Sequence, residues 1–170
     1  MKQIILVATV LAGCAAPTPT TTPTVNLGVV FDPAAARAML VPGVNQIRGS
    51  AFLRQQGGGV VTCAGRDVTL FPATLYAQRV FAAIYGTDEG AARRLTRRVT
   101  VSPPSDDYGR VSRTTQSDAQ GSFTFDRLAD GDYFVETVVT WVVGGVENGG
   151  AIMRRVKVSG GAVASVVISP

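Results

Sequence analysis

The 170-residue sequence has no histidine, and this absence narrows the chemistry that the protein can perform. Histidine is the commonest general base in enzymes and the commonest metal ligand in proteins. A glycine run such as Gly57–Gly59 can belong to a phosphate-binding loop, but the lysine and the helix start of such a loop do not follow it here. Four aspartates lie between residues 118 and 132, but their spacing is not that of a calcium loop, and aspartate is common at turns. We therefore predict no catalytic residues, no cofactor and no metal site.

A strong charge of either sign is also absent. The sequence has 16 Lys and Arg against 12 Asp and Glu. Removal of residues 1–13 would remove one charged side chain, that of Lys2. A net charge near +3 does not indicate a nucleic-acid-binding protein. The residues from Val25 to Pro170 are enough for one domain with a sizeable core.

No apolar run near the N-terminus is long enough to cross a membrane. Ile4–Ala12 is a largely apolar run of nine residues that follows the basic Lys2. A membrane-spanning helix needs about 20 apolar residues, whereas a short run behind a positive charge is typical of a secretory signal peptide. We therefore predict that residues 1–13 are a signal peptide.

Cysteine is scarce, and the first of the two cysteines closes this run. Leu11–Cys14 (LAGC) resembles the lipobox of bacterial lipoproteins, in which the chain is cleaved before the cysteine and its thiol carries a diacylglycerol. The resemblance implies an anchor of two or three acyl chains on Cys14, which is enough for stable membrane attachment. Because Ala15 replaces the aspartate of retained lipoproteins, it also implies a place on the periplasmic face of the outer membrane of a Gram-negative bacterium. The alternative is an ordinary signal peptide with a chance cysteine.

Residues 14–24 continue from the cysteine into a tract of proline and threonine, AAPTPTTTPT, with little to bury. At about 3.1 Å per residue in an extended polyproline conformation, this tract predicts a tether of about 30 Å. The second cysteine, Cys63, lies in an apolar strand pattern. We expect it to be buried, with pairing between chains as the alternative.

The rest of the chain indicates one β-rich domain with two helices. Asp32–Leu40 has a capping residue followed by proline, which predicts a short helix within an N-terminal appendage of residues 25–45. Thr74–Tyr85 has helical spacing. Strand patterns separated by glycine-rich turns fill residues 46–170, and the last turns are predicted to form hairpins. We expect this β-sandwich to fold alone from about residue 44.

The stretch from Thr114 to Thr137, TTQSDAQGSFTFDRLADGDYFVET, resembles the carboxypeptidase regulatory-like domain. The resemblance implies a seven-stranded, transthyretin-like Greek-key β-sandwich, here with a helix-containing insertion at residues 74–98. In this motif Phe123 and Phe125 point into the core and Tyr133 packs beneath a turn. Such domains accompany peptidases, receptors and adhesins as accessory modules, so the resemblance implies no activity.

The insertion contains four arginines in six residues: Arg93, Arg94, Arg97 and Arg98. Such a run can be a solvated basic turn. It can also bind an anionic partner, such as an envelope protein or a phosphate-bearing lipid or glycan, because the guanidinium group matches phosphate with two hydrogen bonds.

We therefore predict a lipid-anchored interaction or structural module of the cell envelope, without catalytic activity. The alternatives are a small envelope hydrolase, whose serine or carboxylates no spacing identifies, and a glycan-binding accessory protein. A glycan site would need an exposed aromatic side chain, and we expect Trp141, in a valine-rich strand, to lie in the core.

Overall fold

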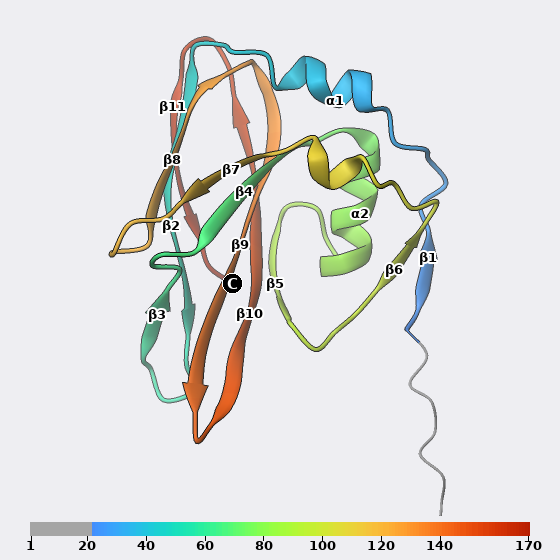
Figure 1. Cartoon of the computed structure of the whole chain (residues 1–170). Helices are drawn as coiled ribbons and strands as arrows, with labels where there is room; N and C mark the ends of the chain where they lie inside the picture. Colours follow the sequence, from blue (N-terminus) through green and yellow to red (C-terminus); the bar gives the residue numbers. More distant parts are fainter. Residues whose placement is uncertain (1–21) are drawn as a thin grey trace, which may run out of the picture.

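A computed structural model describes residues 22–170, so the predicted signal peptide, Cys14 and most of the tether lie outside the described residues (Figure 1). Two β-sheets pack face to face. The first has the order β5-β10-β9-β4-β7: Gly90–Arg94, Val146–Val158, Gly131–Val143, Asp67–Pro72 and Arg113–Gln116. The second has the order β11-β2-β3, with β8 also paired to β2: Val163–Ile168, Asn45–Arg54, Val60–Thr62 and Ser122–Leu128. The predicted β-sandwich is confirmed.

Both predicted helices are present. α1 (Pro33–Met39) begins after Asp32, whose carboxylate accepts hydrogen bonds from the amides of Ala34 and Ala35. α2 (Leu75–Tyr85) ends at Gly86, which has φ of 83°. The helix packs Phe81 against Phe134 on the outer face of the first sheet, with ring centroids 4.2 Å apart. No helix within residues 22–170 is long and apolar enough to span a bilayer.

The main core lies between the sheets and includes the residues of the resemblance motif. Phe123 and Phe125 are buried there. The hydroxyl of the buried Tyr133 lies within hydrogen-bond distance of two carbonyls that can accept its hydrogen, those of Met39 at 2.8 Å and Ala129 at 3.0 Å. Cys63 is completely buried and its thiol lies 3.4 Å from the carbonyl of Gly121. The expectation of a buried thiol is therefore confirmed.

Two turns that were predicted as hairpins, at residues 118–121 and at 160–161, connect the two sheets instead, and so does the turn near Gly131. The turn at Asp118–Gly121 joins β7, which pairs with β4, to β8, which pairs with β2. The turns near Gly131 and Gly160 likewise join strands of different sheets. Gly121 has φ of 82°, so the residues at these turns fix the reversal of the chain. They do not determine which strand the next segment pairs with.

The described residues form eleven strands where the resemblance implied seven. Short β3 and β5 lie at the edges of the two sheets, and β1 (Thr24–Asn26) and β6 (Thr100–Ser102) form a separate parallel pair. β5 has the sequence GAARR, which carries no alternating apolar pattern. It becomes a strand because β10 supplies an antiparallel partner from Gly150 to Arg154.

The N-terminal segment is part of the fold and not an appendage. Leu27, Phe31 and Ala36 form a third apolar cluster with residues of α2 and with Val111. The tether shortens accordingly, since the carbonyl of Pro23 accepts a hydrogen bond from Thr100 and Thr24 begins β1. β2 starts at Asn45, one residue before the predicted domain boundary at residue 46.

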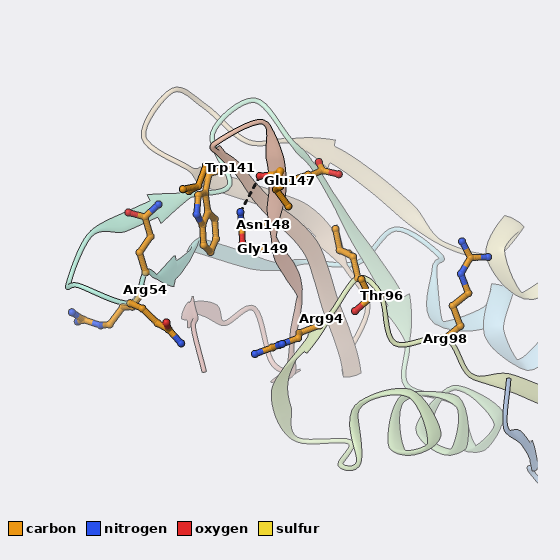
Figure 2. Close-up of a pocket in the computed structure, with 13 residues that line it drawn as sticks. Arg54, Arg94, Thr96, Arg98, Trp141, Glu147, Asn148 and Gly149 are labelled. Carbon is orange, nitrogen blue, oxygen red and sulfur yellow. Dashed lines mark hydrogen bonds between the residues drawn. The ribbon is translucent and has the colours of Figure 1, made fainter. Parts of the chain in front are cut away.

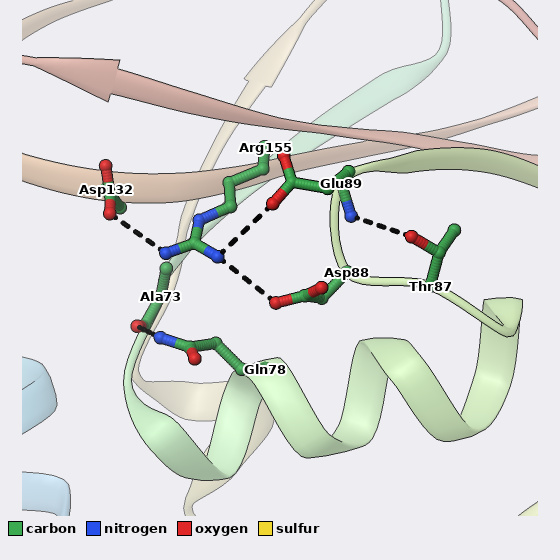
Figure 3. Close-up of polar contacts among 7 residues, drawn as sticks. All are labelled: Ala73, Gln78, Thr87, Asp88, Glu89, Asp132 and Arg155. Carbon is green, nitrogen blue, oxygen red and sulfur yellow. Dashed lines mark hydrogen bonds and ion pairs between the residues drawn. The ribbon is translucent and has the colours of Figure 1, made fainter.

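Arg155 of β10 holds the loop after α2 onto the sheet (Figure 3). Its guanidinium nitrogens lie 3.1 Å from an Asp88 oxygen, 3.7 Å from a Glu89 oxygen and 3.0 Å from an Asp132 oxygen. One guanidinium group thereby pairs with all three carboxylates. Within residues 22–170 no cluster of Cys, Asp or Glu has the arrangement of a metal site.

Candidate functional site: a hollow at the open end of the sandwich

A hollow of about 1250 Å³ lies at one end of the sandwich (Figure 2). Three segments that are distant in sequence line it: the loop between β2 and β3, the turn after β5, and the hairpin of β9 and β10. The hairpin turns through Gly144 and Gly145, both at positive φ, which are the residues of a two-residue hairpin loop.

Trp141 lies in this hollow, which corrects the prediction that it belongs to the core. It is half-buried at the margin of the main core, on the same face of β9 as the fully buried Val139. In Figure 1 the β9–β10 hairpin extends beyond the end of β2 in the facing sheet, and Val142 and Val143 at the end of β9 are exposed. Burial is therefore lost along the last residues of β9, and the indole remains accessible to a ligand.

Polar side chains surround the indole. Asn148, directly opposite Trp141 in the β ladder, donates a hydrogen bond of 2.9 Å to the carbonyl of Val146, which holds its amide in place. Gln55 and Gln56 supply two more amides from the loop after β2. In Figure 2 the pair of Trp141 and Asn148 lies between Arg54 on one side and the turn after β5 on the other.

The four predicted arginines do not form one patch. Arg94 and Arg98 line the hollow and are exposed, as is Arg97. Arg93 is less exposed: its guanidinium lies 5.6 Å from the ring centroid of Tyr85 and donates a hydrogen bond of 3.2 Å to the carbonyl of Arg97. Arg93 and Arg94 are successive residues of a strand, so their side chains point to opposite faces of the sheet. Arg93 therefore stabilises the turn after β5, and Arg94, Arg97 and Arg98 remain exposed.

Arg97 and Arg98 also line a smaller hollow of about 510 Å³ together with Thr22. Thr22 is the first residue of the described chain. The chain thus enters the folded domain beside the arginine turn.

Behind the sheet, Arg93 faces a polar group between α2 and β9. Tyr85 donates a hydrogen bond to the carboxylate of Glu136. Burial raises the pKa of Glu136, and the hydrogen bond from Tyr85 and the charge of Arg93 oppose this rise in part. Burial, with the neighbouring carboxylate, also raises the pKa of Tyr85 and of Tyr108. This group supports the site from the far face and does not line the hollow.

The raised pKa of Glu136 leads to a prediction about pH. The folded protein holds a proton on Glu136 more tightly than the unfolded chain does, so stability falls as the pH rises through the raised pKa. Glu136→Gln removes this loss and keeps an acceptor for Tyr85. The variant is expected to melt about 2–4 °C higher than the wild type at about pH 8 and at the same temperature near about pH 4. Thermal unfolding at the two pH values tests this, with the exposed Glu147→Gln as the matched control. A lower melting temperature of Glu136→Gln at about pH 8 would contradict it.

Trp141 and Asn148 were missed at the site although the sequence carries a signal for them. Val143-Gly144-Gly145-Val146 is the pattern of a two-residue hairpin loop, which sets the register and places residue 141 opposite residue 148. No local sequence pattern indicates how far the facing sheet extends along β9. The exposure of the indole could therefore not be predicted from the sequence.

Comparisons with known proteins bear on the fold more than on the site. No protein-family model matches the chain, and no curated protein matches it. A crystal structure from Pseudomonas aeruginosa, described as a "putative carbohydrate binding protein", is similar with a TM-score of 0.63 and 25% sequence identity. The similarity covers 79% of this chain and 93% of the other. The β-sandwich is therefore an arrangement that another solved protein shares.

Proposed function

We propose that the protein is a lipid-anchored glycan-binding module of the cell envelope and that the hollow around Trp141 is its sugar site. The observation that carries the proposal is a half-buried indole in a hollow that amide and guanidinium groups also line. A sugar ring has an apolar face that packs on an indole and hydroxyls that pair with planar polar groups. The similar structure described as a putative carbohydrate binding protein supports the same class of ligand.

Binding without catalysis fits the residues that line the hollow. Glu147 is the one carboxylate among the lining residues within the described chain. Glycoside hydrolysis ordinarily uses two carboxylates on either side of the scissile bond. The lining therefore supports a binding module more than the alternative of a small hydrolase.

Replacement of Trp141 tests the sugar site. Trp141→Ala is expected to weaken glycan binding by at least about tenfold, because truncating a tryptophan at the centre of a binding site costs about 2 kcal/mol or more. Trp141→Phe keeps a ring and should retain part of the affinity. Val163→Ala, at an exposed valine of β11, is the matched control. The measurement is a glycan array followed by calorimetry on the ligands found. Equal affinity of wild type and Trp141→Ala would contradict the site.

The lipid anchor is a separate part of the proposal. Cells fed a palmitate analogue are expected to label the wild-type protein and not Cys14→Ala, which should leave the membrane fraction or keep its signal peptide. Cys63→Ala is the matched control, because the Cys63 thiol is buried in the core and should not accept the label. Absence of label on the wild type would refute the anchor.

A further inference from the structure

We propose that the saccharide bound in the hollow is the headgroup of an anionic glycolipid in a membrane surface, and that the tip of the β9–β10 hairpin enters the acyl region. This inference rests on the proposed sugar site and adds the chemical class of its ligand. Three observations carry it: an apolar tip, an excess of arginine, and the place where the chain enters the domain.

The tip of the hairpin is apolar and exposed to solvent. Val142, Val143 and Val146 flank the Gly144–Gly145 turn, with exposed fractions of 70%, 58% and 64%. The hairpin reaches beyond the rest of the sandwich in Figure 1. By strand alternation, Val143 and its ladder partner Val146 share the face of the hollow, and Val142 lies on the opposite face. Both sides of one projecting turn are therefore apolar and exposed, which favours a contact with an apolar medium or partner.

The residues next to this tip select a lipid with an anionic headgroup. Arg54, Arg94 and Arg98 line the hollow against the single carboxylate of Glu147. Arg97 is exposed on the same turn as Arg98. A phosphate or carboxylate on the sugar would complement this charge, and guanidinium groups bind phosphate with paired hydrogen bonds. A protein partner would not account for a sugar-binding indole beside the valines, whereas a glycolipid offers a saccharide, an anionic group and acyl chains in one molecule.

The entry point of the chain places this end of the domain near the lipid. Thr22 lies beside Arg97 and Arg98, and it is eight positions along the chain from Cys14. Eight residues span at most about 29 Å. Figure 1 shows the start of β1 and the β9–β10 tip directed toward the same end of the molecule. An acyl chain on Cys14 in the same leaflet as the glycolipid would therefore hold the hollow and the valine tip within reach of it. For lipopolysaccharide that is the outer leaflet, so the inference replaces the periplasmic face implied by Ala15 with the cell surface. Charge attraction, which decays over about 8 Å at physiological salt, then acts at contact.

Vesicle binding tests the inference. The protein is used as a soluble chain that begins at Thr22, because it keeps all the buried hydrophobic residues of the described part of the chain, from Leu27 to Ile168. The probes are phosphatidylcholine vesicles alone, the same vesicles with phosphatidylglycerol, the same vesicles with lipopolysaccharide, and the deacylated oligosaccharide of that lipopolysaccharide. We expect the lipopolysaccharide vesicles to bind at least about tenfold more tightly than the free oligosaccharide and the phosphatidylglycerol vesicles.

Two variants separate the tip from the sugar site. Val142→Thr changes the tip valine that does not line the hollow, keeps the β-branched shape, and is expected to reduce the vesicle advantage while leaving oligosaccharide binding unchanged. Val163→Thr, at an exposed valine of β11, is the matched control and should change neither. Circular dichroism melts confirm that all variants fold.

The outcomes distinguish this inference from the proposed function. Equal affinity for the free oligosaccharide and the vesicles, with no effect of the tip variant, would overturn the inference and leave the sugar site standing. Equal binding to phosphatidylglycerol and lipopolysaccharide vesicles, unaffected by Trp141→Ala, would also overturn it in favour of a general anionic surface. Failure to bind any saccharide, free or in vesicles and on a glycan array, would overturn both.

Discussion

Phe31→Ala is expected to lower the free energy of unfolding by about 3–4 kcal/mol, the cost of removing a buried phenylalanine from a core. The Phe31 ring is 8% exposed, and its centroid lies 5.3 Å from that of Tyr76 and 5.5 Å from that of Tyr108. These contacts join the N-terminal segment to α2 and to the turn before β7. The loss of stability should therefore be as large as that caused by truncating a phenylalanine in the main core between the two sheets.

The neighbouring residue provides the control for Phe31. Val30 is 75% exposed, and Val30→Ala should change the stability by no more than about 0.5 kcal/mol. Denaturant unfolding followed by circular dichroism gives both values. If Phe31→Ala proves as mild as Val30→Ala, the N-terminal segment does not belong to the cooperative unit, and the sandwich from about residue 44 folds alone as the sequence suggested.

The N-terminal segment shows where reasoning from the sequence reaches its limit. The α1 helix was predictable because its signals, Asp32 and Pro33, are local. The burial of Leu27 and Phe31 depends on Tyr76, Val80 and Val111, which are 45 or more residues away along the chain. Nothing in the pattern around residue 27 identifies those partners, so the segment was interpreted as an appendage.

The same distinction applies to the strands and to the site. β9 and β11 were predicted close to their observed bounds, because alternation and glycine turns are local features. β10 was predicted only from Ile152, six residues after its observed start, and β8 only to Phe125. β5 was missed, because its strand conformation comes from pairing with β10. The arginine run was recognised, yet only a strand assignment for β5 would have separated Arg93 from Arg94. The pairing of the strands and the length of the facing sheet decide how exposed Trp141 is. Both are properties of the whole fold and not of the local sequence.

Asn45→Asp is expected to have the other large effect, a loss of about 3–5 kcal/mol near neutral pH. Asn45 is 1% exposed and uses its whole amide. Its nitrogen donates to the carbonyl of Leu128 at 3.0 Å and to the carboxylate of Asp130 at 2.8 Å. Its oxygen accepts from the backbone amides of Gly161 and Ala162. One side chain thereby ties β2 to the turns before β9 and β11.

The substitution keeps the two accepted hydrogen bonds and replaces both donors with a negative charge. That charge would face the carbonyl of Leu128 and the carboxylate of Asp130 in a buried position. Asn26→Asp is the matched control, since Asn26 is exposed and only its oxygen is used, as an acceptor from the amide of Gly28. Its effect on stability should be small. Urea unfolding of the two variants and the wild type gives the comparison.

The pH dependence identifies the cause of the loss. In the wild type, hydrogen bonds from Asn45 and from the backbone of Gly160 lower the pKa of Asp130. The stability that Asp130 contributes is therefore present above the ordinary range of aspartate and is lost as the pH falls through its lowered pKa. In Asn45→Asp the introduced carboxyl is buried beside a like charge, so its pKa is raised and it gains a proton as the pH falls. Protonation restores a donor toward Asp130 or Leu128, and the difference between variant and wild type should narrow between about pH 7 and about pH 4. A difference that stays constant over this range would show that lost packing, and not the unpaired charge, destabilises the variant.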